Sequence, residues 1–506
     1  MPFGPTHELI KTIANWGVNS YYSTIVICHP NHVPKSGPVI FATNHWNMTV
    51  DPTIVSTKMP HGRQVHYWAK SSLFNNPIVR YVLLDAGNIP VYRNSKNHQL
   101  LFQGTFDVLK LGECIALFPE GTSYTEPKIM QIKDGLAWTA LGFAKNLRLT
   151  GSKLSGQPET AAGLSKAPGP VKDVQVVVCG LSYTHKTRYR SSVQVEFSSP
   201  LTLEQPIIDQ FMTEGQEKIA IRTFMQQIET RLKQVTINSE DWETLWCVWI
   251  IREMIWQDGL GPLQHYRHNM QLLVNLFSLK EGLSPIILNL RTNLLKYHHL
   301  LASVDSTHLL FSCTFPHSNS RYRLAIQLGR CLVRWPFFSI PALFHIPVYF
   351  GSYIGSGLQP TESESTDQNH IVLGLFSGLF FVPIYVYLLT RSLLAQQSEI
   401  NWISRLVAAS LSLTVVVLIH IIHDGLVDTN FEAWKRLRLC WKLKENGLNQ
   451  LWDARKCCEE GWKELREELK NSNDTLLNNL IEGHEIMHEL IEVDEEEVGL
   501  ETKKNE

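Results

Sequence analysis

The sequence predicts an α/β domain, then a helical region, then a transmembrane hairpin. Short β-rich runs alternate with helical patterns over the first 200 residues, which is typical of an α/β domain. Helical patterns alone continue to about residue 330, and two long uncharged apolar runs come after them. Since a single core stops growing at roughly 250 to 300 residues, a chain of 506 residues is expected to fold as two or more modules.

The expected strands are short apolar and β-branched runs that turn residues separate. A helical pattern at Leu100–Leu111 lies between two of them. The runs are Tyr22–Cys28, Pro38–Thr43, Val65–Ala69, Cys114–Phe118, Val174–Cys179 and Gln194–Phe197.

A helix is expected near the start of the chain, because apolar residues recur there at helical spacing. Such a helix can pack on the protein core or lie on a membrane surface, and we favour core packing. Residues 1–27 lack the basic segment and continuous apolar run of a signal peptide, so we expect the first domain not to be secreted. The apolar positions of the helix are Leu9, Ile10, Ile13 and Trp16.

Composition divides the chain further. Residues 150–172 are rich in Gly, Ser, Pro and Ala without periodicity, which predicts a flexible insertion. The residues from Glu492 onward are largely acidic and predict a solvated end. The predicted domains are an α/β domain at 1–200, a helical extension at 201–334, a hydrophobic membrane region at 335–425 and a helical cytosolic tail at 426–506.

Two runs are candidates for membrane spans. Ile371–Thr390 holds 20 uncharged residues, of which 13 are Ile, Val, Leu or Phe. Leu406–Ile422 is at the short limit of about 17 residues, and the loop between the runs allows a helical hairpin. A third run, Trp335–Ile354, contains three prolines and is predicted to be re-entrant or interfacial. The alternative for these runs is buried helices of a soluble domain.

Basic residues flank the apolar region on both sides, whereas the hairpin loop holds only Arg391 and Arg405. Cytoplasmic flanks of membrane spans are enriched in Lys and Arg, so we expect both flanks in the cytosol. The flanking residues are Arg321, Arg323, Arg330 and Arg334 before the region and Lys435, Arg436, Arg438, Lys442 and Lys444 after it.

Charge and cysteine usage exclude several classes of protein. A net charge of −2 offers no basic face for phosphate backbones, so no nucleic-acid partner is expected. The nine cysteines are scattered, with only Cys457 and Cys458 adjacent and none in a C-x-x-C pair. This pattern favours a reducing compartment, and we expect no metal and no cofactor.

The segment NHWNMTVDP, residues 44–52, places His45 just after an apolar strand and Asp51 six positions later. A carboxylate that holds Nδ1–H of an imidazole leaves Nε2 as a base, and a hydroxyl needs such a base to act as a nucleophile at neutral pH. Alone the pair is weak evidence, since a His and an Asp this close in sequence are more often structural.

Three further segments carry candidate binding residues. LFPEGTSY, residues 117–124, places Glu120 and Gly121 at a strand end, where a glycine lets backbone amides approach an anion. AGNIPVYR ends in Arg93, whose guanidinium can bind phosphate bidentately. GLSYTHKTRYR, from residue 180, has a basic loop. Each alone has a plain structural reading: a turn, a solvated arginine and a surface charge run.

In combination, the order and spacing of these four segments resemble the glycerolipid acyltransferase family. The resemblance is narrower with the fungal and protist type of glycerol-3-phosphate and dihydroxyacetone-phosphate acyltransferases, on the entry VPKSGPVIFATNH, the long His-to-Asp spacing, EGTS and the GLSY loop. It covers about residues 17–200, and it implies a mixed sheet with flanking helices. The later helices and apolar runs match that type only by their arrangement.

The resemblance implies roles for named residues. His45 is expected to be the general base and Asp51 its orienting partner. Glu120 and Gly121 are expected to line the acceptor and oxyanion region, and Arg93 to bind the acceptor phosphate. The full set of expected substrate-binding residues is Arg93, Glu120, Gly121, Thr122, Lys133, Lys186 and Arg190.

The chain departs from the family at two places. Five residues, Trp46–Val50, separate the His and the Asp, where most of the wider family has four. In IKDG, residues 132–135, Lys133 precedes Asp134 where the fungal and protist type usually has Thr. A carboxylate beside an anion site weakens phosphate binding, so the identity of the acceptor is left open.

The expected activity is transfer of a fatty acyl group from the co-substrate acyl-CoA to glycerol-3-phosphate or dihydroxyacetone phosphate. The resemblance further implies a multi-pass protein of the endoplasmic reticulum membrane, with its catalytic domain facing the cytosol and a lipid bilayer as partner. Two alternatives stay open, a lysophospholipid (1-acylglycerol-3-phosphate) acyltransferase and a catalytically silent lipid-binding scaffold. The sequence names no protein partner.

Overall fold

The computed structural model describes residues 3–91, 98–154, 173–256, 263–278, 285–315, 320–358, 363–395, 401–443 and 445–470. They form two compact units. The first contains the chain up to Lys186 and Ser191–Asn238, and the second contains Thr187–Arg190 and the described chain from Ser239 on. Three predictions fall outside the described residues: the insertion from residue 155 to 172, the acidic end and the placement of Arg93.

The first unit is built on one mixed sheet, as predicted. Its strands are ordered β1-β7-β6-β2-β5-β3-β4, and β8 pairs with β6. Among the described strands, β6 runs antiparallel to β7 and β8, and the other pairs are parallel. The strands are β1 (Thr24–Cys28), β2 (Val39–Thr43), β3 (Val65–Lys70), β4 (Ile89–Val91), β5 (Cys114–Leu117), β6 (Gln175–Tyr183), β7 (Ser192–Phe197) and β8 (Leu201–Thr202).

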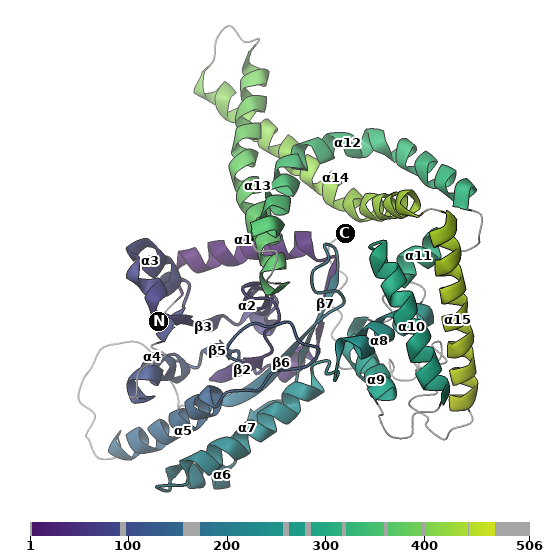
Figure 1. The fold of residues 1–506 in the computed structure, drawn as a ribbon. Helices are drawn as coiled ribbons and strands as arrows, with labels where there is room; N and C mark the ends of the chain where they lie inside the picture. Colours follow the sequence, from purple (N-terminus) through teal and green to yellow (C-terminus); the bar gives the residue numbers. More distant parts are fainter. Residues whose placement is uncertain are drawn as a thin grey trace. The chain divides into compact units, whose positions relative to one another are not determined.

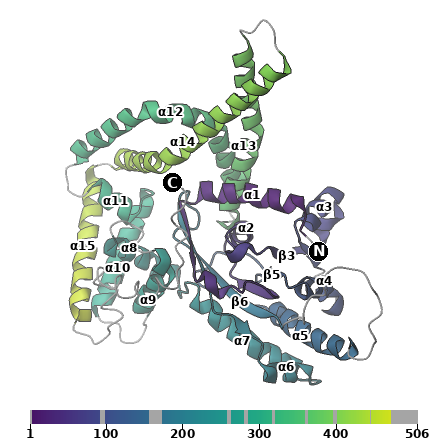
Figure 2. The same cartoon turned by 180° about the vertical axis from the view of Figure 1, so that it is seen from behind.

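The helices of this unit connect and cover the strands (Figures 1 and 2). They are α1 (Pro5–Tyr21), α2 (Val50–Thr57), α3 (Pro77–Asp85), α4 (His98–Lys110), α5 (Gly135–Leu154), α6 (Gln205–Met212) and α7 (Glu217–Gln234), with short 3₁₀ turns at Pro30–His32, Pro60–Gly62 and Ser71–Asn75.

Strand β2 lies at the centre of the sheet, between β5 and β6. All five of its residues are buried, which fits its uninterrupted apolar sequence, because parallel strands covered on both faces are apolar throughout. On one face, Ile40 and Ala42 join a core that includes Phe143 of α5 and Phe224 of α7. Because β2 is central, its C-terminal end places His45 at the middle of one sheet edge.

Helices α6 and α7 belong to the α/β unit, although the sequence placed the domain boundary near residue 200. Ile208 and Phe211 of α6, and Phe224 and Ile228 of α7, are buried in the same core as the sheet residues. The unit therefore continues to Asn238. The boundary was missed because helical periodicity shows that a helix has an apolar face but does not show which core receives it.

Core packing was predicted for the first helix, and this is wrong for three of its apolar side chains. Leu9 is 59 % exposed, Ile10 41 % and Trp16 37 %. The buried positions of α1 include Val18 and Tyr21 instead. The helix packs on the unit through its C-terminal end and leaves apolar side chains of its earlier turns uncovered.

The second unit is helical throughout its described part, as the sequence predicts. Its elements are α8 (Trp242–Ile255), a 3₁₀ turn at Leu263–His265, α9 (Tyr266–Ser278), α10 (Pro285–Ser303), α11 (His308–Thr314), α12 (Ser320–Leu358), α13 (Ser363–Leu394), α14 (Trp402–Lys442) and α15 (Glu445–Lys470). Polar side chains join α12 to α14: Nε2 of His345 lies 3.1 Å from Nδ1 of His420, and the hydroxyl of Tyr349 lies 2.7 Å from Nε2 of His423.

Three helices of this unit are long and apolar enough to cross a membrane, at Leu332–Gly355, Ser365–Leu394 and Trp402–Lys442. The last two contain the predicted spans, and the first contains the proline-rich run. Three crossings would place the two basic flanks on opposite sides of the bilayer. The expectation that both flanks face the cytosol therefore requires that α12, with Pro336, Pro341 and Pro347 inside it, does not cross.

One arginine ties together the turns that precede β2 and β5. The guanidinium of Arg63 donates to the carbonyl oxygens of Pro34 at 2.9 Å, Gly37 at 2.6 Å and Gly112 at 2.7 Å. Backbone carbonyls at turns need donors when they are withdrawn from water. A planar group with several fixed N–H donors meets three of them at once.

We expect Arg63→Ala to lower the free energy of unfolding by about 2 to 4 kcal/mol, because it removes charge-assisted hydrogen bonds and leaves partly buried carbonyls unsatisfied. The measurement is the thermal unfolding midpoint of the purified full chain in detergent. Arg222→Ala, at an exposed arginine of α7, is the control. Equal midpoints for the two variants would show that the three contacts add nothing to stability.

Candidate active site

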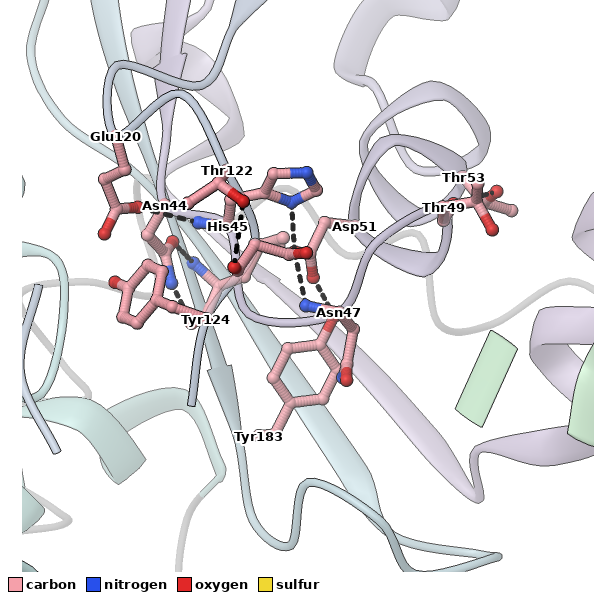
Figure 3. A network of polar contacts seen from close by, with 12 residues as sticks. Asn44, His45, Asn47, Thr49, Asp51, Thr53, Glu120, Thr122, Tyr124 and Tyr183 are labelled. Atoms are coloured by element: carbon pink, nitrogen blue, oxygen red, sulfur yellow. Dashed lines mark hydrogen bonds and ion pairs between the residues drawn. The ribbon is translucent and has the colours of Figure 1, made fainter. Parts of the chain in front are cut away.

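The His–Asp pair is formed in the structure. His45 follows β2, and Asp51 lies in the first turn of α2, so the connection between strand and helix brings them together. Nδ1 of His45 lies 2.9 Å from Oδ2 of Asp51, as Figure 3 shows. The imidazole is 16 % exposed and the carboxylate is fully buried. Nε2, on the other edge of the ring, is left for a reacting group.

Asp51 is held by three further features. Its Oδ2 accepts the backbone N–H of Asn47 at 2.7 Å, and its Oδ1 accepts the hydroxyl of Tyr183 at 2.5 Å (Figure 3). Its position in the first turn of α2 is favourable for a negative charge, because unpaired N–H groups gather there. Together with His45, these features fix the carboxylate, so it can orient the imidazole rather than react itself.

Glu120 positions His45 through the backbone. The carboxylate is buried, and its two oxygens accept the N–H of His45 at 2.9 Å and the N–H of Met130 at 3.0 Å. The backbone N–H of Tyr124 donates to the carbonyl of His45 at 3.1 Å. Burial raises the pKa of Glu120, and the two amide hydrogen bonds act in the opposite direction. With both oxygens engaged, Glu120 supports the loop and does not point at solvent.

Gly121 is a position where only glycine fits without strain. Its φ is +76°, and its N–H donates to the carbonyl of Phe118 at 3.0 Å within a tight turn. A Cβ at this position would lie 2.5 Å from Nζ of Lys133. The missing side chain therefore makes room for the Lys133 ammonium. Because the Gly121 amide is engaged in its own turn, an oxyanion would need a different donor.

The remaining expected binding residues are distributed unevenly. Nζ of Lys186 donates to the carbonyl of Tyr124 at 3.0 Å and to Oγ1 of Thr125 at 2.6 Å, so this lysine joins the loop that supports His45. Arg190 belongs to the helical unit, where its guanidinium forms a two-pronged ion pair with Asp428 of α14. Thr122 and Asp134 are exposed. The structure thus groups Lys133 and Lys186, but not Arg190, around the loop of Glu120.

Sequence reasoning assigned no role to three polar residues that the structure places in the site. Tyr183 and Asn47 bind Asp51. Asn44 accepts the N–H of Leu181 at 2.7 Å and donates to its carbonyl at 3.0 Å, which joins the end of β2 to β6. The available signal was local: Asn44 and Asn47 follow a buried strand, and Tyr183 ends one. The partners of Asn44 and Tyr183 lie 137 and 132 residues away in sequence, so no spacing rule could identify them.

The arrangement supports general-base chemistry. An imidazole whose Nδ1 side faces a buried carboxylate keeps a fixed orientation and presents Nε2 as a proton acceptor. Phe118 stacks on the His45 ring at 4.0 Å between centroids, which limits ring rotation further. Among the described residues no group of three or more His, Cys, Asp and Glu side chains could hold a metal ion.

Comparison with known proteins agrees with this chemistry. Residues 25–145 match the family model described as Acyltransferase. This match covers β1 to the start of α5 and includes His45, Asp51 and Glu120. The segment is therefore an acyltransferase-family domain.

Three fungal proteins are similar to the chain. It is 26 % identical to glycerol-3-phosphate O-acyltransferase 1 of Saccharomyces cerevisiae over 35 % of its own length and 20 % of the relative's. It is 27 % identical to glycerol-3-phosphate O-acyltransferase 2 of the same yeast, over 34 % and 20 %. It is 30 % identical to the uncharacterized acyltransferase C1718.04 of Schizosaccharomyces pombe, over 28 % and 18 %. The matches span about a fifth of each relative.

A solved structure is also similar to the chain. It is the crystal structure of the 1-acyl-sn-glycerophosphate (LPA) acyltransferase PlsC from Thermotoga maritima. The similarity covers 44 % of this chain and 78 % of that one, at 16 % sequence identity and a TM-score of 0.29. A score this low supports no conclusion about the substrate.

We expect Glu120→Gln to lower the free energy of unfolding by about 1 to 2 kcal/mol, because an amide side chain offers one oxygen to two backbone N–H groups. The measurement is the thermal unfolding midpoint in detergent, with Glu204→Gln at an exposed carboxylate of the same unit as control. An unchanged midpoint for Glu120→Gln would mean that the two amide bonds do not hold the loop.

We expect Tyr183→Phe to lower the rate of acyl transfer roughly tenfold, since a hydrogen bond to a carboxylate contributes about 1.5 kcal/mol. The loss should be in kcat, with KM little changed, because Tyr183 touches Asp51 and not the substrate site. The control is Tyr67→Phe, which removes a hydroxyl that donates to the carbonyl of Pro52 at 2.9 Å and does not touch Asp51. Similar rates for both variants would contradict a role of Tyr183 in the dyad.

Proposed function

We propose that this chain is an sn-1 acyltransferase that moves a fatty acyl group from acyl-CoA to glycerol-3-phosphate or dihydroxyacetone phosphate. With glycerol-3-phosphate the product would be lysophosphatidic acid. The observation that carries the proposal is the pair of His45 and Asp51, 2.9 Å apart at the carboxyl end of the central strand, with Nε2 of the imidazole left for a substrate.

The reaction would proceed by direct transfer. Nε2 of His45 takes the proton of the acceptor hydroxyl while its oxygen attacks the thioester carbonyl, which forms a tetrahedral oxyanion. The oxyanion collapses, the C–S bond breaks, and the CoA thiolate takes the proton back from the imidazolium. Asp51 keeps its charge throughout and stabilises the imidazolium that forms between the two steps. No covalent acyl-enzyme is needed.

The choice of a phosphate-bearing acceptor is supported by cationic side chains on the loops around the dyad. The Lys133 ammonium lies against Gly121, and Lys186 is fixed to Tyr124 and Thr125. Both lysines can attract a phosphate as point charges. Arg190 is less suited to this role, because Asp428 already occupies its guanidinium. The names of the two yeast relatives also specify glycerol-3-phosphate as their acceptor.

The proposal places the chain in the endoplasmic reticulum membrane, with the α/β unit facing the cytosol. Three helices long and apolar enough to span support a place in a bilayer. The basic residues that flank the apolar region support a cytosolic position for those flanks. Acyl chains and their lipid products are insoluble in water, so an enzyme held at a membrane meets its donor and releases its product there.

We expect His45→Ala to lower the transfer rate by roughly 10² to 10⁴, the usual contribution of a general base. Asp51→Asn should also slow transfer, because an amide can hold the wrong imidazole tautomer. The measurement is transfer from labelled acyl-CoA by reconstituted full chain to glycerol-3-phosphate, dihydroxyacetone phosphate and lysophosphatidic acid. His29→Asn, at an exposed histidine of the same unit, is the control and should retain the full rate.

The three acceptors separate the alternatives. Transfer to either of the first two that depends on His45 supports the proposal. Transfer to lysophosphatidic acid alone would replace it with a lysophospholipid acyltransferase, which acts on an acceptor already carrying one chain. No transfer to any of the three by a folded chain would favour a catalytically silent lipid-binding scaffold.

A further inference from the structure

Helix α3 is an apolar helix that buries none of its residues. It follows the 3₁₀ turn Ser71–Asn75 in the α/β unit, and both precede β4. Four large apolar side chains of this segment are exposed: Leu73 by 49 %, Ile78 by 75 %, Val79 by 39 % and Tyr81 by 62 %. We call Leu73, Ile78, Val79 and Tyr81 the α3 surface.

Contacts at both ends hold α3 in place. Asn76 caps it by accepting the N–H groups of Ile78 and Val79, and Pro77 occupies its first position. At its other end, the Asp85 carboxylate accepts the N–H of Thr6 at 2.8 Å. A helix of nine residues is marginal in water on its own, so these contacts are what keep its apolar face presented to the outside.

The exposed residues gather on one side of α3. At about 100° per residue, Ile78, Val79 and Tyr81 fall within roughly 160° of the helix circumference. Val82 to Leu84 are partly buried and face the unit. The arrangement resembles that of helices lying in a membrane interface, where apolar side chains and an amphipathic tyrosine enter the boundary between headgroups and acyl chains.

The charges around this surface are of one sign. From residue 70 to residue 84 the sequence contains Lys70 and Arg80 and no Asp or Glu. Both basic residues are exposed. Long basic side chains can extend past a buried apolar face to reach anionic headgroups, and each adds to the attraction of an anionic bilayer. This complementarity favours a lipid surface over a protein partner as the occupant.

We propose that the α3 surface docks on the anionic surface of a lipid bilayer, in addition to whatever anchoring the candidate spans supply. Those spans already bring the chain to a bilayer, so the α3 surface needs only a weak affinity to remain in contact with it. Docking of this kind would hold the α/β unit against the membrane. The inference concerns where the unit rests and does not depend on which acceptor the site uses.

The test is photocrosslinking of the full chain in nanodiscs of phosphatidylcholine and phosphatidylserine. A benzophenone amino acid replaces Ile78 or Tyr81 in separate variants, and a third variant carries it in place of Ile219. Ile219 is the matched control: it is apolar, 54 % exposed and lies on α7 of the same unit. After irradiation, mass spectrometry of the intact chain measures the fraction that has gained a phospholipid.

We expect at least ten times more lipid adduct at Ile78 and Tyr81 than at Ile219. With the label at Ile78, the double variant Lys70→Gln and Arg80→Gln should lower the yield severalfold in the anionic discs and leave it unchanged in pure phosphatidylcholine. The pair Lys218→Gln and Arg222→Gln on α7 controls for a general loss of positive charge.

Equal adduct at Ile78 and Ile219 would overturn the proposal, and so would crosslinking of Ile78 to a second protein chain in place of lipid. A yield that ignores lipid charge would remove the reason for choosing an anionic bilayer and overturn that choice. All variants are repeated in the His45→Ala background. Since this background removes catalysis and leaves α3 untouched, failure of docking and failure of the proposed activity are observed separately.

Discussion

The pairing of β2 with β5 on one side and β6 on the other is the constraint on which the site depends. Parallel neighbours end at the same edge of a sheet, so the residues after β2 and β5 meet: the N–H of His45 reaches the Glu120 carboxylate. Strand β6 runs past that edge and carries Tyr183 to Asp51. If the register of these strands shifted by one residue, each of these contacts would be lost.

The buried carboxylates in this site have different roles. Asp51 accepts hydrogen bonds from a tyrosine and a backbone amide and faces the imidazole, so it sets the orientation of the base. Glu120 accepts backbone amides from two loops and determines where the base stands. Both charges are withdrawn from water, which is tolerable only because each oxygen has a partner.

The helical unit presents polar side chains among its apolar helices, at His345, Tyr349, His420 and His423. Hydrogen bonds between them join α12 to α14, which suits helices that have apolar surfaces facing outward and need directional contacts to pack. Arg190, predicted to bind substrate, is instead paired with Asp428 in this unit. The basic loop of residues 186–190 thus divides between two tasks, since Lys186 stays with the site loop.

The sequence by itself determined the strands, the helical second half, the apolar runs and the dyad of His45 and Asp51, because each depends on periodicity or on residues a few positions apart. Only the tertiary structure decided that α6 and α7 complete the first core, that Leu9 and Trp16 stay exposed, and that Tyr183 and Asn44 join the site. These depend on which surfaces meet across long stretches of chain, and local patterns carry no information about that.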